Sequence, residues 1–207
     1  SEYLNFYNAA GSVPDTGLRA LGTSATARGV GIPGAVRGLL AAHAKYGKLP
    51  RAVVMAPAIR LASEGFTVNA LLSREITSTA EKLKTSDARR LFLPGDKALR
   101  PGDHLIQTEL AQTLRRIAAD GPDVFYTGQI GDDIVKALRA KGSMIERADF
   151  AAYQPRWTRP VCTVYHGRVV LSAAAPQSGI QVIESLNLLA DRSLPELGLP
   201  SRSPDAF

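Results

Sequence analysis

Residues 31–66 read GIPGAVRGLLAAHAKYGKLPRAVVMAPAIRLASEGF, and this stretch decides the fold. Its apolar residues recur at the spacing of amphipathic helices, and Pro and Gly stand where helices begin and end. Pro33 suits a first helical turn, because that turn has no use for the N–H that proline lacks. Gly47 suits the position after a helix, where a left-handed backbone is common. The stretch predicts two consecutive helices, with a break or kink near Ala56 because Pro57 follows it.

The second helix of this pair has an apolar stripe that predicts a buried face. The residues of the stripe are Val53, Val54, Ala58, Leu61 and Ala62. Further helices are predicted from the same spacing over 68–84, 107–119, 129–141 and 180–190, with a short one near 86–92. Asn69 and Ser86 are expected to cap two of them, and Gly142 to end a third.

After Trp157 the spacing of the apolar residues changes from that of helices to that of strands. Residues 158–165 and 168–173 are rich in β-branched side chains and are joined by His166-Gly167, which predicts a hairpin. The turn Val124–Tyr126 is expected to enter the core. The predicted class is therefore α/β in its α+β form, mostly helical with a late β-hairpin. A chain of 207 residues is long enough for one sizeable core or two small ones.

Composition excludes two classes of partner. The formal charge of +6 comes from basic residues scattered along the chain, without the basic runs and aromatic residues typical of nucleic-acid binding. A solvated surface explains this charge, so no nucleic-acid partner is predicted. No run of eighteen apolar residues occurs, so no membrane span is predicted either.

Residue types with catalytic potential have structural explanations here. Cys162, the only cysteine, lies in the predicted hairpin and is expected to be a buried structural thiol. His43, His104 and His166 show no metal-ligand spacing, so no metal site is predicted. Ser178 precedes the last helix without a Gly-x-Ser-x-Gly elbow, which favours an N-cap over a nucleophile. No catalytic residue, cofactor-binding residue or metal ligand is predicted.

A set of short motifs runs through residues 29–189 in one order. They are GIPG (31–34), KYGKLP (45–50), PAI (57–59), EGF (64–66), LFLP (91–94), LRPGD (99–103), GPDVFYTG (121–128), DFAAY (149–153) and PQSG (176–179). In this order and spacing the set resembles the large-subunit region of the γ-glutamyltransferases (γ-glutamyltranspeptidases). The chain departs from that family at 174–180, where AAPQSGI stands in place of a Pro-Pro-Pro-Ser-Ser-Gly-Gly run.

The resemblance implies an N-terminal-nucleophile hydrolase with a four-layer αββα sandwich, of which this chain would be one part. In that family a precursor cleaves itself, and a threonine at the new N-terminus of the small subunit becomes the nucleophile. The implied reaction is γ-glutamyl transfer or hydrolysis, for example of glutathione and γ-glutamyl amides, without a metal or redox cofactor. The implied partner is the small subunit, and apolar surface is expected where it packs.

The resemblance places the catalytic machinery outside this sequence, which has no His-Thr-Thr-type cleavage site. The family's arginine for the substrate α-carboxylate lies in a preceding segment, and neither Arg19 nor Arg28 sits in its motif. Ser1 is N-terminal but aligns within the large subunit, so it is not taken as the nucleophile. Residues 1–207 are expected to be one segment of the large subunit, incomplete at both ends. The run Ser203–Asp205, which is typical of a helix start, agrees.

Two other functions stay open. A sibling acylase of the same superfamily would cleave a different amide, such as a β-lactam side chain or poly-γ-glutamate. A catalytically inactive helical scaffold would bind a partner instead. The family's bacterial members are typically periplasmic or secreted, and a single cysteine decides neither for nor against that location.

Overall fold

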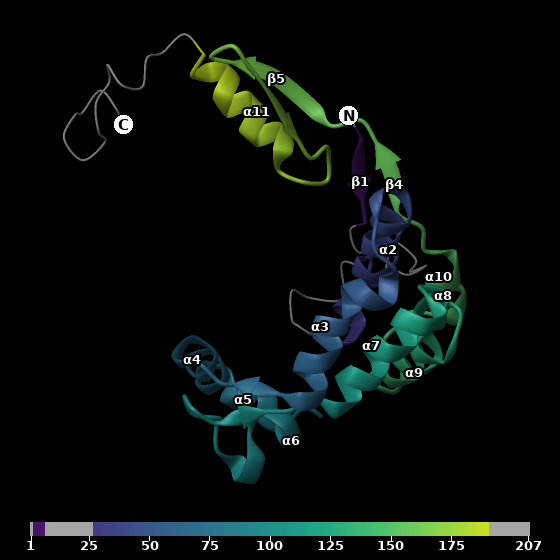
Figure 1. The fold of residues 1–207 in the computed structure, drawn as a ribbon, viewed down its shortest axis with the longest axis vertical. Helices are drawn as coiled ribbons and strands as arrows, with labels where there is room; N and C mark the ends of the chain where they lie inside the picture. Colours follow the sequence, from purple (N-terminus) through teal and green to yellow (C-terminus); the bar gives the residue numbers. More distant parts are fainter. Residues whose placement is uncertain (1, 7–26, 191–207) are drawn as a thin grey trace, which may run out of the picture. The chain divides into compact units, whose positions relative to one another are not determined.

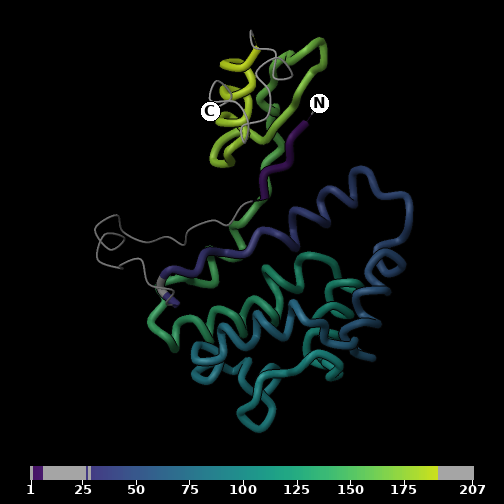
Figure 2. Tube along the Cα trace, turned by 90° about the vertical axis from the view of Figure 1, so that its left-hand side faces the viewer, coloured from purple at the N-terminus to yellow at the C-terminus, as the bar shows by residue number. Residues whose placement is uncertain are grey.

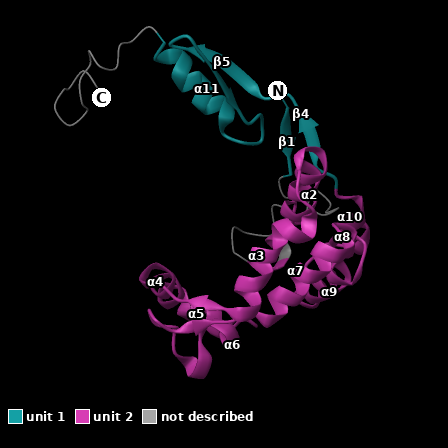
Figure 3. Ribbon diagram, viewed as in Figure 1, with its two compact units in different colours: residues 1–7, 154–207 teal, residues 8–153 magenta. Residues whose placement is uncertain are grey.

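The computed structural model describes residues 2–6 and 27–190 (Figure 1). The chain forms two compact units, one of residues 8–153 and one of residues 1–7 with 154–207 (Figure 3). The Arg19, Ser1 and Ser203–Asp205 predictions lie outside the described residues. No helix of the described ranges is long and apolar enough to cross a membrane.

The larger unit, residues 8–153, is mostly helical (Figure 2). Its described elements are η2 (Ala27–Gly29), α2 (Ala35–Tyr46), α3 (Arg51–Glu64), β2 (Phe66–Thr67), α4 (Ala70–Ser78), α5 (Ala80–Lys84), α6 (Arg89–Phe92), η3 (Pro94–Asp96), β3 (His104–Leu105), α7 (Thr108–Asp120), α8 (Asp123–Tyr126), α9 (Gln129–Ala140) and α10 (Arg147–Ala152). Strands β2 and β3 pair antiparallel.

The two helices predicted from residues 31–66 are confirmed as α2 and α3. Of the break or kink predicted near Ala56, the break does not occur, because α3 runs without interruption through Pro57. Contacts with α7 and its N-cap residue lie on both sides of the proline: Arg51 donates to the Ala118 carbonyl, and the Ala62 carbonyl accepts from the Gln107 N–H. Gly47 also differs from the prediction, with an extended backbone at φ −67°. A glycine is needed there because a Cβ would lie 2.4 Å from the carbonyl oxygen of His43.

Two apolar cores stabilise this unit. The first contains Ile32, Ile117, Phe125, Tyr126, Val135, Ile145, Phe150 and Tyr153. The second, around the β2–β3 ladder, contains Val68, Ile76, Leu93, Leu99 and Leu105. Phe125 and Tyr126 are buried, as predicted for the turn that carries them. The helices predicted over 107–119 and 129–141 are confirmed as α7 and α9, and Gly142 follows α9 with φ 85°.

The helix predicted over 68–84 is two helices, α4 and α5, because the backbone leaves the helical region at Thr79. Asn69 caps α4 as predicted: its side chain accepts a 2.8 Å hydrogen bond from the Leu72 N–H. Ser86 does not cap α6. Its hydroxyl donates instead to the Leu83 carbonyl, 2.9 Å away.

The smaller unit combines short strands with one helix. Its elements are β1 (Tyr3–Asn5), β4 (Arg156–Thr158), β5 (Val161–Tyr165), β6 (Arg168–Ser172) and α11 (Gly179–Leu188). β5 and β6 form the predicted antiparallel hairpin, and His166 and Gly167 at its turn have φ of 46° and 72°, as a tight turn between twisted strands requires. β1 pairs with β4, which was not predicted, because three residues are too few to show a period. Helices with separate antiparallel ladders confirm the α+β class.

Candidate functional site

The histidines of the larger unit, which could carry acid–base or metal chemistry, contact backbone carbonyls. The Nε2 atoms of His43 and His104 lie 2.9 and 2.7 Å from the carbonyl oxygens of Leu49 and Glu64. Within residues 2–6 and 27–190 no three His, Cys, Asp or Glu side chains gather where they could hold a metal ion. Ser178 stands at the N-cap position of α11, as predicted, but its side chain makes no capping hydrogen bond.

Cys162 is exposed, which corrects the prediction of a buried thiol. Side chains alternate along β5, and Thr163 points toward α11, where its hydroxyl hydrogen-bonds to Asn187. Cys162 and Val164 therefore lie on the opposite face of the hairpin. Because α11 packs on one face only, the thiol is left uncovered.

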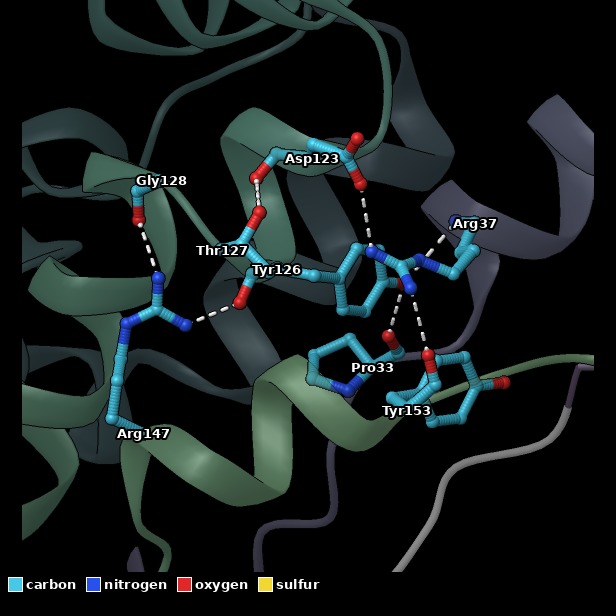
Figure 4. A network of polar contacts seen from close by, with 8 residues as sticks. All are labelled: Pro33, Arg37, Asp123, Tyr126, Thr127, Gly128, Arg147 and Tyr153. Carbon is cyan, nitrogen blue, oxygen red and sulfur yellow. Dashed lines mark hydrogen bonds and ion pairs between the residues drawn. The ribbon is translucent and has the colours of Figure 1, made fainter.

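The most developed polar arrangement centres on Arg37, a residue of α2 that is only 9% exposed (Figure 4). Its guanidinium donates to the Asp123 carboxylate at 3.1 Å and to the Tyr153 carbonyl at 3.0 Å. The same group lies 4.4 Å from the centre of the Tyr126 ring, within cation–π range. The buried Nε of Arg37 has no hydrogen-bond partner among the described residues. One arginine thereby joins α2 to α8 and to the end of α10.

The Tyr126 hydroxyl makes hydrogen bonds with backbone groups at the start of α2. Its hydroxyl donates to the Pro33 carbonyl at 2.6 Å and accepts from the Arg37 backbone N–H at 3.2 Å. Helix N-termini leave N–H groups without partners, and Gly34 at the N-cap position has no side chain to offer. The phenol of a distant residue takes the place of a local cap.

Burial raises the pKa of Tyr126 above its ordinary value near 10, although the hydrogen bond from Arg37 acts in the opposite direction. Burial likewise raises the pKa of Tyr153, against the charge of Arg37. Both phenols are therefore neutral at physiological pH. The contacts of the cluster join α2, α8 and α10.

Arg147 extends the same network on the other side of Tyr126 (Figure 4). Its guanidinium donates to the carbonyls of Tyr126 and Gly128 and pairs with Asp132. Asp132 lies in the first turn of α9, where a negative charge is favourable. Arg147 thus holds the junction of α8 and α9 against α10.

The smaller unit presents an apolar sheet face, which we call the outer hairpin face, made of Cys162, Val164, Val169 and Leu171. These residues form the cross-strand pairs Cys162–Leu171 and Val164–Val169. Val164 and Val169 are 65% and 70% exposed. Together with Cys162 and Leu171 they make a contiguous apolar patch on this face of the hairpin. Exposed apolar surface was predicted where a partner packs.

Comparisons with known proteins agree on one family. The sequence model of the Gamma-glutamyltranspeptidase family matches residues 8–203. The Acylase ACY 1 proenzyme of Pseudomonas sp. (strain SE83) is 37% identical over 177 residues, which are 84% of this chain and 32% of that protein. The Glutathione hydrolase proenzyme of Escherichia coli (strain K12) is 34% identical over 174 residues, 83% of this chain and 30% of that protein. The chain thus spans about a third of these relatives.

A solved structure extends the likeness to the fold. Helicobacter pylori gamma-glutamyltranspeptidase superposes with a TM-score of 0.86 at 29% sequence identity, covering 95% of this chain and 60% of that one. The order and spacing of the motifs in residues 29–189 could find this relationship from sequence alone. The contacts of Arg37 with Tyr126 and Tyr153 could not be predicted from the sequence, because no local pattern links residues so far apart.

Proposed function

Since this chain belongs to the γ-glutamyltranspeptidase family, we propose that it is the large-subunit part of an enzyme that transfers or hydrolyses γ-glutamyl groups. The family match over residues 8–203 carries the proposal. The substrates would be glutathione and other γ-glutamyl amides. The acyl group would pass through an ester on a threonine of a second, small subunit to water, an amino acid or a peptide.

The role proposed for residues 1–207 is to build and dock, not to react. Burial raises the pKa values of Tyr126 and Tyr153, and the two described histidines of unit 8–153 contact backbone carbonyls. The outer hairpin face offers an apolar surface of the kind that a partner subunit covers. An apolar sheet face of this kind fits a second β-sheet, as a sandwich of packed sheets would supply.

A second candidate is an acylase of the same superfamily. The identity to the Acylase ACY 1 proenzyme, 37%, is not lower than the 34% to the Escherichia coli glutathione hydrolase proenzyme. This observation favours neither activity over the other, so the substrate must be measured. A periplasmic or secreted location belongs to the same proposal, and fractionation of cells that express the complete gene would test it.

The test is an activity comparison on the protein made from the complete gene. Hydrolysis of γ-glutamyl-p-nitroanilide, accelerated by glycylglycine as acceptor, is the expected result. Hydrolysis of a cephalosporin side-chain amide with no γ-glutamyl activity would favour the acylase. Absence of both activities in a folded, uncleaved chain would contradict the enzyme proposal and favour a scaffold.

A further inference from the structure

A second surface lies in the helical unit, between α3 and α7, and we call it the α3–α7 groove. It is a shallow, open depression with a volume of about 580 Å³. Its apolar floor comes from α3, and two arginines stand at its rim; the main lining residues are Val53, Ala56, Pro57, Ile59, Arg60 and Arg115. Ser63 and Glu64 line the end of the groove.

The floor of the groove shares Val53 with the apolar stripe that the sequence predicts to be buried, and its other apolar residues are Ala56, Pro57 and Ile59. Of that stripe only Ala62 is buried, whereas Val53 is 54% exposed and Val54 and Leu61 are similarly open. Another face of α3 packs on α7. The helix is therefore well packed although the stripe is exposed. An apolar stripe on a well-packed helix indicates a second contact surface.

The rim of the groove carries positive charge. Arg60 and Arg115 make no ion pair or hydrogen bond with any described residue through their side chains. Arg51, by contrast, donates to the carbonyls of Ala118 and Ala119 at the end of α7, 2.8 Å from each. Glu64 is the one carboxylate in the lining, against two guanidinium groups. The groove therefore suits a ligand with carboxylates, which guanidinium binds in a two-pronged geometry.

Pro57 removes one hydrogen bond within α3, because it has no N–H to donate to the Val53 carbonyl. The groove combines apolar area with two cationic donors, which are the complementary groups for a polypeptide segment with acidic side chains.

We infer that the α3–α7 groove is an internal docking surface, occupied in the longer protein by an apolar segment that carries acidic side chains. The occupant comes from the part of the protein outside residues 1–207, because this chain spans about a third of its proenzyme relatives. The inference rests on the proposed function only in taking the chain as part of a longer proenzyme. Arg60 and Arg115 pair with the carboxylates of the segment.

Photo-crosslinking in the full-length protein identifies the occupant. A benzophenone amino acid replaces Val53 on the groove floor, and in a control variant it replaces Lys136, which is exposed on α9. After irradiation, mass spectrometry of the digest reads the captured peptide. The expected result is capture by Val53 of one segment from outside residues 1–207 that contains Asp or Glu, and no such capture by position 136. Capture of a second copy, capture within residues 1–207 only, or no capture would each overturn the inference.

Charge reversal then tests the role of the rim. The pair Arg60→Glu and Arg115→Glu is expected to lower the crosslink yield from position 53 roughly tenfold, since like charges would then face each other. The matched control is Arg116→Glu, on α7 but outside the groove lining, with unchanged yield expected. An equal loss in both variants would contradict a specific contact. Capture of the acidic segment in a protein without γ-glutamyl activity would remove the proposed function and leave the groove assignment standing.

Discussion

The Tyr126 hydroxyl donates a 2.6 Å hydrogen bond to the carbonyl of Pro33, 93 residues earlier in the chain. The same oxygen accepts from the Arg37 N–H, so one phenol satisfies two backbone groups at the start of α2. Tyr126 is fully buried and belongs to the larger apolar core. The GIPG and GPDVFYTG motifs are therefore joined by a direct contact.

Tyr126→Phe removes that contact while keeping the ring. Two buried backbone groups lose their partner, and the expected loss in the free energy of unfolding is about 1–3 kcal/mol. Urea titration of the full-length protein, followed by circular dichroism, measures it. Tyr46→Phe is the control, because Tyr46 is 61% exposed and a change within about 0.5 kcal/mol is expected there. Equal effects of the two substitutions would refute the capping role.

Alkaline pH is expected to weaken the same region. Burial raises the pKa values of Tyr126 and Tyr153 in the folded state above their ordinary value of 10, which applies in the unfolded chain. The folded state then holds protons that the unfolded state releases, so stability is intact below pH 10 and falls as the pH rises beyond it. Thermal melting between pH 8 and 11 tests this. The Tyr126→Phe, Tyr153→Phe double variant should lose less of its melting temperature over that range, and an unchanged slope would contradict the assignment.

Gly179→Ala should disrupt the smaller unit. A Cβ at this position would lie 1.9 Å from the carbonyl oxygen of Ala173 and 2.8 Å from its carbonyl carbon, so the end of β6 and the start of α11 would have to separate. Overpacking against backbone is expected to cost about 3 kcal/mol or more. Gly95→Asn is the matched control, since Gly95 has open space around it and a left-handed backbone that Asn tolerates. A thermal melt of each variant decides between them.

Cys162 reports whether the outer hairpin face is covered in the longer protein. The thiol is exposed in this chain, next to Leu171 on the neighbouring strand. If a partner subunit packs on this face, maleimide should label Cys162 at least tenfold more slowly in the native full-length protein than in urea, because opening must come first. Peptide mass spectrometry assigns the label to this residue. Equal labelling rates would show that the face is open to solvent.

The helices were predictable where the local pattern and the packing agree. Asn69, Gly142 and the His166-Gly167 turn act through neighbours in sequence, and all three are as predicted. The break predicted near Ala56 does not occur: α3 runs through Pro57, and contacts with α7 and its N-cap residue lie on both sides of the proline. Local propensity does not include that tertiary support.

Burial was less predictable than secondary structure, because it too depends on contacts with distant parts of the protein. Cys162 and Val53 lie on apolar faces that a sequence pattern assigns to the interior, yet both are exposed in this chain. A periodic stripe shows that a face is apolar and does not show which part of a protein covers it. The Arg37 cluster was not predicted either, because its partners Asp123 and Tyr153 are 86 and 116 residues away.

The central claim is that this chain belongs to a proenzyme whose nucleophile lies in another segment. The most direct test is the intact mass and N-terminal sequence of the protein expressed from its complete gene. Two fragments are expected, the larger containing residues 1–207 and the smaller beginning with threonine. A single uncleaved chain, folded and stable after prolonged incubation, would contradict the account.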